Sequence, residues 1–167
     1  NKDILFQAFF QLQLKGYIPI VAHPEKNRLI QECPEIMNEL VLKGALGQVT
    51  AGSLLEDACP RDRQCAQELL RRNCVQVLSS DAHSYCFRPP CLRQGLEKAA
   101  LLLNSMPKAA DLVNTWPNAI IRGQKVQTPQ SVQPKQANPK PGKGLFNFLQ
   151  SLVLSLLSSR TKISSCK

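Results

Sequence analysis

Apolar residues recur at two different spacings along residues 1–121, and these spacings predict helices alternating with strands. Apolar positions that return every three or four residues predict helices at 3–15, 34–43, 60–72, 91–104 and 107–114, and a short closing turn or helix is expected at 117–121. Three short apolar runs without polar alternation, at 17–22, 45–50 and 74–79, predict strands. Such runs are typical of parallel strands that are covered on both faces.

Glycine and proline mark the ends of the predicted helices. Gly16 and Gly44 follow two of them as stops, while Pro34 and Pro60 suit the first turn of the next two. Strands that alternate with helices of about ten residues indicate βαβ units. The sequence therefore predicts an α/β fold with a parallel sheet.

Polar residues follow each of the three predicted strands. His23 ends the first strand, Thr50 to Ser53 end the second, and Asp81 and His83 end the third. In parallel α/β folds the functional residues gather at the carboxyl ends of the strands. We therefore expect these side chains to share one rim of the sheet.

His23 and His83 are the only histidines of the chain, and both lie at strand ends. A single histidine is more often structural, but imidazole together with the carboxylate of Asp81 suits Zn, Mn or Fe. Three candidate ligands from two strand ends make a metal site as good an interpretation as a structural role. Glu25 is another potential ligand, although a carboxylate at a helix start or on the surface is the simpler interpretation.

Cationic residues follow the same strand ends. Arg88 precedes two prolines that stiffen its backbone, and its planar fork suits a phosphate, although a surface loop arginine would look the same. Lys26 and Arg28 follow His23 closely, and either supplies a second cation. The pattern is compatible with a phosphate beside the predicted metal.

The positive charge is concentrated at the end of the chain. Residues 1–121 hold 13 basic and 12 acidic residues, whereas residues 122–167 hold 8 basic residues and no acidic ones. We predict a domain at 1–123, a Pro/Gln/Lys-rich linker at 124–144 and a short amphipathic basic tail at 145–167. The tail is expected to be disordered. Membrane-surface contact, docking on a partner and folding back remain alternatives, because its apolar stretch 145–157 is too short to span a bilayer.

Other features limit the class of protein. The seven cysteines form no CxxC pair, which favours reduced thiols and a cytoplasmic location, with Cys86 and Cys91 flanking Arg88. The nearly neutral body without a binding motif argues against nucleic acid as a partner. The chain begins with Asn1, directly in a helical pattern, so we expect a fragment of a longer domain.

Several segments resemble one known family. Residues 16–25 (GYIPIVAHPE), 44–54 (GALGQVTAGSL), 80–83 (SDAH) and 88–90 (RPP) are similar, in order and spacing, to segments of bacterial capsule and exopolysaccharide tyrosine-protein phosphatases. These belong to the polymerase and histidinol phosphatase (PHP) superfamily. The resemblance covers residues 16–121 and implies the C-terminal part of such a domain.

The resemblance implies a partial PHP-type distorted (β/α) barrel that hydrolyses phosphotyrosine in proteins such as an exopolysaccharide tyrosine kinase. By this resemblance His23, Asp81 and His83 are ligands of manganese or another divalent metal, and Arg88 is a phosphate-binding, catalytic residue. Lys26 stands where the family usually has an arginine. It therefore offers the single charge of an ammonium group instead of a planar guanidinium that can donate two parallel hydrogen bonds.

The family's earlier His-x-His strand and its further ligands have no counterpart in residues 1–167. We therefore expect weak activity, or none, unless another chain completes the site. Two alternatives stay open: an inactive remnant that serves as an interaction or membrane-associated module, and another PHP phosphoesterase such as a histidinol phosphatase. A homo-oligomer is a further expectation.

Overall fold

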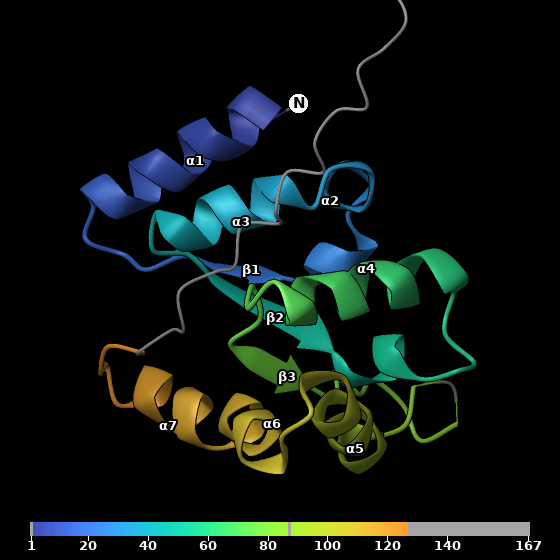
Figure 1. Ribbon diagram of the computed structural model, residues 1–167. Helices are drawn as coiled ribbons and strands as arrows, with labels where there is room; N and C mark the ends of the chain where they lie inside the picture. Colours follow the sequence, from blue (N-terminus) through green and yellow to red (C-terminus); the bar gives the residue numbers. More distant parts are fainter. Residues whose placement is uncertain (1, 87, 127–167) are drawn as a thin grey trace, which may run out of the picture. The chain divides into compact units, whose positions relative to one another are not determined.

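The computed structural model describes residues 2–86 and 88–126 (Figure 1). Most of the predicted linker 124–144 and the whole predicted tail 145–167 lie outside the described residues. Their boundaries therefore stay predictions. Within the described part of the chain, no helix has the length and apolar character needed to cross a membrane.

The centre of the fold is a parallel sheet with the order β1-β2-β3. Its strands are β1 (Ile20–Ala22), β2 (Leu46–Thr50) and β3 (Val77–Ser79). Ile20 pairs with Leu46, and Gln48 pairs with Val77, so all three strands run in register toward one rim. The predicted α/β class with a small parallel sheet is confirmed.

The predicted helices are present, with ends that differ by one or two residues. They are α1 (Lys2–Leu14), α3 (Glu35–Leu42), α4 (Pro60–Arg71), α5 (Leu92–Leu103), α6 (Met106–Val113) and α7 (Thr115–Ile121). Gly16 and Gly44 adopt φ values of 80° and 98°, the left-handed conformation expected of helix stops. Pro34 occupies the N-cap position of α3, so this helix begins one residue later than predicted.

Three short elements were not predicted: η1 (Pro24–Lys26), α2 (Arg28–Glu32) and η2 (Ala51–Leu54). Asn27 starts α2, since its side chain accepts hydrogen bonds from the amides of Leu29 and Ile30 at 3.0 and 3.4 Å. The two 3₁₀ turns lie directly after β1 and β2. They shape the rim where the predicted site residues lie.

The first strand differs from its prediction in length and in burial. The run 17–22 was expected to be a buried strand, but only Ile20–Ala22 is extended, and Tyr17 and Ile18 are 63% and 57% exposed. Because β1 is the edge of the described sheet, one side of it has no neighbouring strand to cover these residues. The expectation of burial on both faces is therefore wrong for β1.

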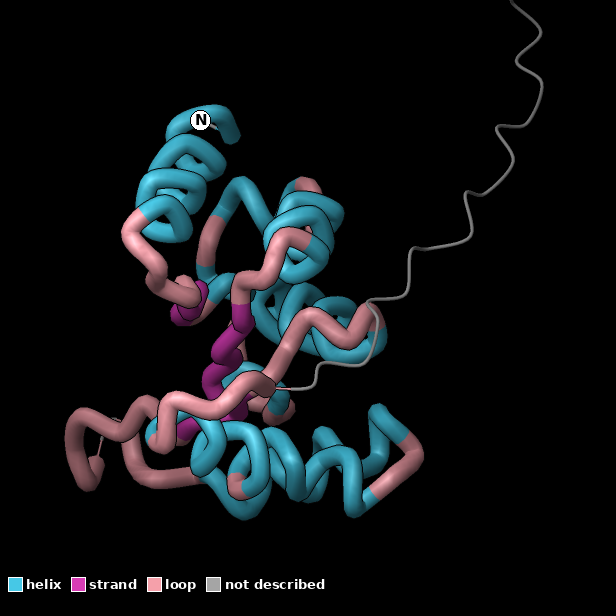
Figure 2. Tube along the Cα trace, turned by 90° about the vertical axis from the view of Figure 1, so that its left-hand side faces the viewer, coloured by secondary structure: helices cyan, strands magenta, loops and turns pink. Residues whose placement is uncertain are grey.

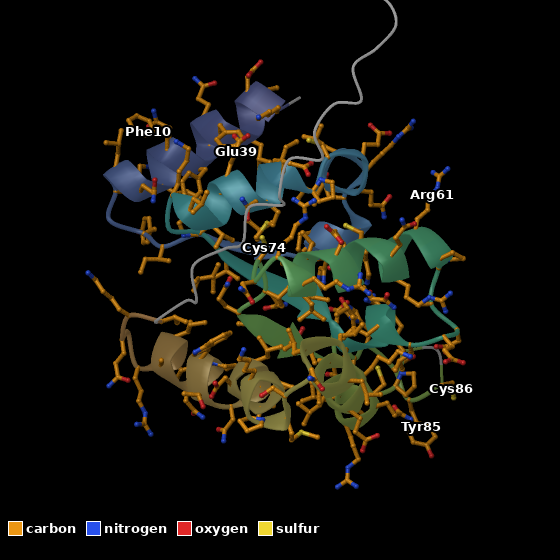
Figure 3. All side chains as sticks on the ribbon, in the orientation of Figure 1. Phe10, Glu39, Arg61, Cys74, Tyr85 and Cys86 are labelled. Atoms are coloured by element: carbon orange, nitrogen blue, oxygen red, sulfur yellow. The ribbon has the colours of Figure 1, made fainter. Side chains whose placement is uncertain are left out.

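The core lies between the sheet and its helices, and it is mainly aliphatic, as the composition suggests. Met37, Leu40, Val49 and Leu69 are fully buried there. Cys74 lies at the centre of the molecule, whereas Tyr85 and Cys86 lie at its outer edge (Figure 3). Gly47 is required in β2, since a Cβ atom there would lie 2.1 Å from the carbonyl oxygen of Cys74.

Candidate active site

His23 and Asp81 lie at the carboxyl ends of β1 and β3, where the chain turns sharply. Both have positive φ, 52° and 49°, which is uncommon for residues other than glycine. Such left-handed positions often occur at functional sites, because the surrounding structure must hold them. The parallel register places both turns on one rim.

The His23 ring is fixed between β2 and Asp81. Its Nδ1 is hydrogen-bonded to Oγ1 of Thr50 at 2.9 Å, and its Nε2 lies 3.5 Å from Oδ1 of Asp81. The His23 side chain is 32% exposed and that of Asp81 is 14% exposed. The two strand ends therefore bring an imidazole and a carboxylate together in a partly shielded position.

Two cations approach the same carboxylate. Nζ of Lys26 lies 3.6 Å from Oδ2 of Asp81, and Nη2 of Arg88 is hydrogen-bonded to that oxygen. Arg88 is placed by a short antiparallel bridge with Ser84, whose hydroxyl accepts from the Arg88 amide at 3.2 Å. Arg28, the alternative second cation, instead pairs with Glu32.

His83 lies beside Asp81 but points more toward solvent, with 62% of its side chain exposed. Its Nδ1 donates to the carbonyl oxygen of Asp81 at 2.8 Å. A carbonyl oxygen only accepts, so Nδ1 carries the proton and Nε2 of the neutral ring keeps its lone pair. Nε2 is therefore the ring nitrogen that is available to bind a metal ion.

The donor types at this rim suit a divalent transition metal, but they do not form a finished site. Among residues 2–86 and 88–126, no group of three or more His, Cys, Asp or Glu side chains is arranged to hold an ion. The carboxylate of Asp81 is turned toward Arg88 and Lys26 instead. The donor atoms of His23, Asp81 and His83 therefore suit a metal ion, but further ligands would be needed to hold it.

Glu25 supports the site through buried hydrogen bonds, a role that the sequence did not reveal. It lies in the first turn of η1, as the helix-start expectation had it, but it is fully buried, so the expectation of a surface carboxylate is wrong. Its Oε1 accepts from the Thr50 amide at 3.1 Å and from the Ser53 hydroxyl at 2.9 Å. Since Thr50 in turn holds His23, Glu25 ties the end of β1 to the end of β2. The two hydroxyl residues Thr50 and Ser53 at a strand end were the signal in the sequence for this connection.

A cavity of about 320 Å³ opens next to the two cations. Lys26 and Arg88 line it, together with the apolar side chains of Leu55, Ala58 and Pro89. The carboxylates Asp57 and Asp62 line it as well, so the cavity holds charges of both signs, and the side with the two cations is the part that suits a phosphate. Of the two cysteines that flank Arg88 in the sequence, Cys91 also lines this cavity, whereas Cys86 is exposed.

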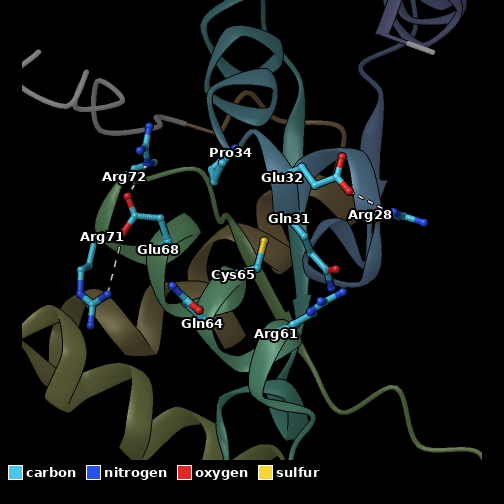
Figure 4. A pocket seen from close by; sticks show the side chains of 10 residues that line it. All are labelled: Arg28, Gln31, Glu32, Pro34, Arg61, Gln64, Cys65, Glu68, Arg71 and Arg72. Carbon is cyan, nitrogen blue, oxygen red and sulfur yellow. Dashed lines mark hydrogen bonds and ion pairs between the residues drawn. The ribbon is translucent and has the colours of Figure 1, made fainter. Parts of the chain in front are cut away.

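A larger groove of about 590 Å³ lies between α2 and α4, away from the predicted site residues (Figure 4). Its arginines are largely neutralised: Arg72 pairs with Glu68 at 2.6 Å, and Arg71 lies 3.9 Å from the same glutamate. Burial raises the pKa of the Cys65 thiol in this groove to about 11, so this thiol is unreactive near neutral pH. We therefore place the candidate site at the strand rim.

Known proteins resemble this chain over part of their length. CapC from Staphylococcus aureus is 43% identical over 88 residues, which are 53% of this chain and 34% of CapC. YwqE from Bacillus subtilis, named a tyrosine-protein phosphatase, is 45% identical over 78 residues, which are 47% of this chain and 31% of YwqE. The chain thus spans about a third of the length of these relatives.

A solved structure has the same fold. It comes from work on YwqE of Bacillus subtilis and CpsB of Streptococcus pneumoniae, described as unique metal-dependent tyrosine phosphatases. It superimposes with a TM-score of 0.69 at 32% identity, covering 78% of this chain and 52% of that chain. The resemblance seen in residues 16–121 is confirmed. A family model for capsular polysaccharide synthesis, CpsB/CapC, matches residues 2–122, and the chain belongs to this family.

Proposed function

We propose that this chain forms the C-terminal part of a metal-dependent phosphatase that removes phosphate from tyrosine residues of proteins. The observation that carries the proposal is the meeting of His23, Asp81, Lys26 and Arg88 at the carboxyl ends of β1 and β3. The similarity to proteins named tyrosine-protein phosphatases supports the same activity.

His23, Asp81 and His83 would hold the metal, which we propose to be manganese, with other divalent ions as alternatives. When bound, such an ion polarises a phosphoryl oxygen and activates a water molecule. The remaining ligands would come from a region of the domain outside residues 1–167. This part fits a distorted (β/α) barrel of the PHP type, of which the three parallel strands would be one portion.

Arg88 and Lys26 would bind the phosphoryl oxygens. In the present arrangement both cations share the carboxylate of Asp81. With the Asp81 carboxylate serving as a ligand instead, both cations would be free to turn into the adjacent cavity and neutralise charge that develops on the phosphoryl group. The apolar side chains in the lining of that cavity, Leu55, Ala58 and Pro89, would receive the aromatic ring of phosphotyrosine, next to the carboxylates of Asp57 and Asp62.

The family description of capsular polysaccharide synthesis suggests the substrate. We propose a phosphotyrosine protein of that system, such as the exopolysaccharide tyrosine kinase. A small phosphomonoester such as histidinol phosphate is the competing substrate class, since it requires the same metal residues.

Metal binding tests the first step of the proposal. Mn²⁺ is titrated into the chain by calorimetry, and into His23→Ala, Asp81→Ala and Glu97→Ala variants. Glu97 is an exposed carboxylate on α5, so its variant controls for loss of charge. Binding that the first two substitutions abolish and the third leaves unchanged is the expected result. Equal binding by all four proteins would overturn the assignment of the ligands.

Hydrolysis tests the second step. Release of phosphate from a phosphotyrosine peptide, a phosphoserine peptide and histidinol phosphate is measured with Mn²⁺ and with a chelator. The chain is combined for this assay with the part of Bacillus subtilis YwqE that it does not match, because the remaining ligands are proposed to lie outside residues 1–167. We expect the phosphotyrosine peptide to be the best substrate, and we expect Arg88→Ala to reduce its turnover about 100-fold or more. Arg93→Ala is the matched control, since Arg93 is an exposed arginine five residues further along. Faster turnover of histidinol phosphate would favour the competing class, and no turnover of any substrate would favour the inactive remnant.

A further inference from the structure

The cysteines of the described residues lie in two kinds of surroundings. Cys65 and Cys74 are buried in the core, and burial raises the pKa of their thiols to about 11 and about 12. A thiol reacts as its thiolate, so these two are inert near neutral pH. The other described cysteines are exposed or half-buried: Cys33, Cys59, Cys86 and Cys91.

Cys59 and Cys91 face the same cavity. Both line the space of about 320 Å³ that also contains Lys26 and Arg88. Cys59 is the N-cap residue of α4 and Cys91 is that of α5, and these helices follow β2 and β3. Loops connect the strands to the helices (Figure 2), and a helix that follows a parallel strand begins near the carboxyl end of that strand. A Cβ atom at Gly52 would lie 3.4 Å from Sγ of Cys91, so this sulfur lies against η2 at the rim.

The charges that accompany the two thiols differ in sign. Asp57 lies two residues before Cys59, and Asp62 lies in the first turn of α4. Arg88 lies three residues before Cys91, and the first turn of α5 has no acidic residue. The partial positive charge of a helix N-terminus attracts anions, and acidic residues in the same turn counteract it. An anionic reagent is therefore attracted to Cys91 more than to Cys59.

We propose that this cavity is a site of reversible thiol modification, in which Cys91 exchanges with small anionic disulfides. The Cys91 thiol gives its proton to water, its sulfur attacks one sulfur of the reagent, and the S–S bond of the reagent breaks. A mixed disulfide with Cys91 forms, and the released half of the reagent takes up a proton and leaves as a free thiol.

The cations of the cavity give the reagent its direction. Lys26 and Arg88 line the same space as Cys91, and they attract the carboxylates of an anionic disulfide. The attached group then occupies the part of the cavity beside these cations, where the proposed function places the phosphoryl group. Loss of phosphatase activity on modification therefore rests on the proposed function, whereas the exchange itself does not.

Two reagents of opposite charge test the proposal. The 167-residue chain is treated with glutathione disulfide, which is anionic, or with cystamine, which is cationic, and peptide mass spectrometry follows each cysteine. The quantity compared is the rate with glutathione disulfide divided by the rate with cystamine. We expect this ratio to be about fivefold or more higher for Cys91 than for Cys59. Cys65 and Cys74 should stay unmodified, and the exposed Cys86, which is not among the residues that line the cavity, gives the reference reactivity.

A charge variant tests the part played by the cations. Lys26→Ala should lower the ratio at Cys91 about threefold or more, because it removes a cation from the cavity lining. Lys43→Ala is the matched control, since Lys43 is an exposed lysine at the end of α3. No reaction of Cys91, a ratio no higher than that of Cys59, or a ratio that Lys26→Ala leaves unchanged would each overturn the proposal.

Phosphatase activity is measured separately, on the chain combined with the part of Bacillus subtilis YwqE that it does not match. Glutathione disulfide should lower this activity about tenfold or more, and Cys91→Ser should prevent the loss, each protein being compared with its own untreated sample. A loss that persists in Cys91→Ser would overturn the role of this thiol. Absence of activity before treatment would contradict the proposed function and leave the modification site standing.

Discussion

Strands β1 and β2 lie side by side in one sheet, yet Ile20 of β1 is 41% exposed while Val49 of β2 is fully buried. Both strands were predicted from similar apolar runs. β2 lies between two strands and under α3, whereas β1 forms the edge. The difference shows that an apolar run predicts a strand but does not reveal what covers it.

The comparison also explains how the candidate site is supported. His23 follows the weakly packed strand, and its position depends on polar ties to β2 through Thr50 and Glu25. The strand β2 itself is held by close packing, as the contact of Gly47 with Cys74 shows. Packing should therefore dominate the stability of β2, and hydrogen bonds should dominate the order of the site.

The largest expected difference between the two strands comes from Gly47→Ala. The added Cβ would meet the Cys74 carbonyl oxygen at 2.1 Å and the Met37 side chain at 2.9 Å. Since the nearest atom belongs to the backbone, we expect a loss of about 3 kcal/mol in the free energy of unfolding. Ile18→Ala, at the exposed start of β1, should cost less than about 1 kcal/mol. Urea unfolding measures both, and equal losses would contradict the comparison.

A smaller effect is expected where polar contacts replace packing. Glu25→Ala removes the acceptor for the Thr50 amide and the Ser53 hydroxyl, and leaves both groups buried. We expect a loss of about 2 kcal/mol, with Glu25→Gln costing less because it keeps an acceptor oxygen.

The control for Glu25 is Glu97→Ala, which removes an exposed carboxylate and should change the free energy of unfolding by less than about 0.5 kcal/mol. Urea unfolding of the three variants gives the ranking. A Glu25→Ala variant as stable as the control would show that this carboxylate does not hold the two strand ends together.

The features that local sequence determines were predictable. Gly16 and Gly44 end helices because only glycine adopts their positive φ without strain, and a short apolar run between such stops becomes a strand. The chain order of the strands then places His23, Asp81 and His83 on one rim through the general geometry of parallel sheets. These predictions needed no knowledge of tertiary contacts.

The features that depend on tertiary contacts were not predictable. Whether Tyr17 and Ile18 are covered depends on a neighbouring strand, which their own sequence does not encode. The burial of Glu25 depends on donors 25 and 28 residues away, Thr50 and Ser53. The pairing of Asp81 with Arg88 likewise depends on how the intervening loop folds back.

The smallest expected effect concerns Glu35 at the start of α3, at the margin of the packed region. A hydrogen bond from its own backbone amide lowers the pKa of this carboxyl; partial burial opposes the shift, while Cys33 and Arg72 add to it. A lowered pKa in the folded state means that the contribution to stability is present above the ordinary pKa of about 4.3 and is lost as the pH falls through the folded value. Glu35→Gln should therefore reduce stability at pH 7, by about 0.5 kcal/mol or less because solvent screens this 48% exposed side chain. The difference between variant and parent should be smaller at pH 3 than at pH 7. Urea unfolding at both pH values measures it, and a difference that stays constant with pH would show that the carboxylate charge plays no part.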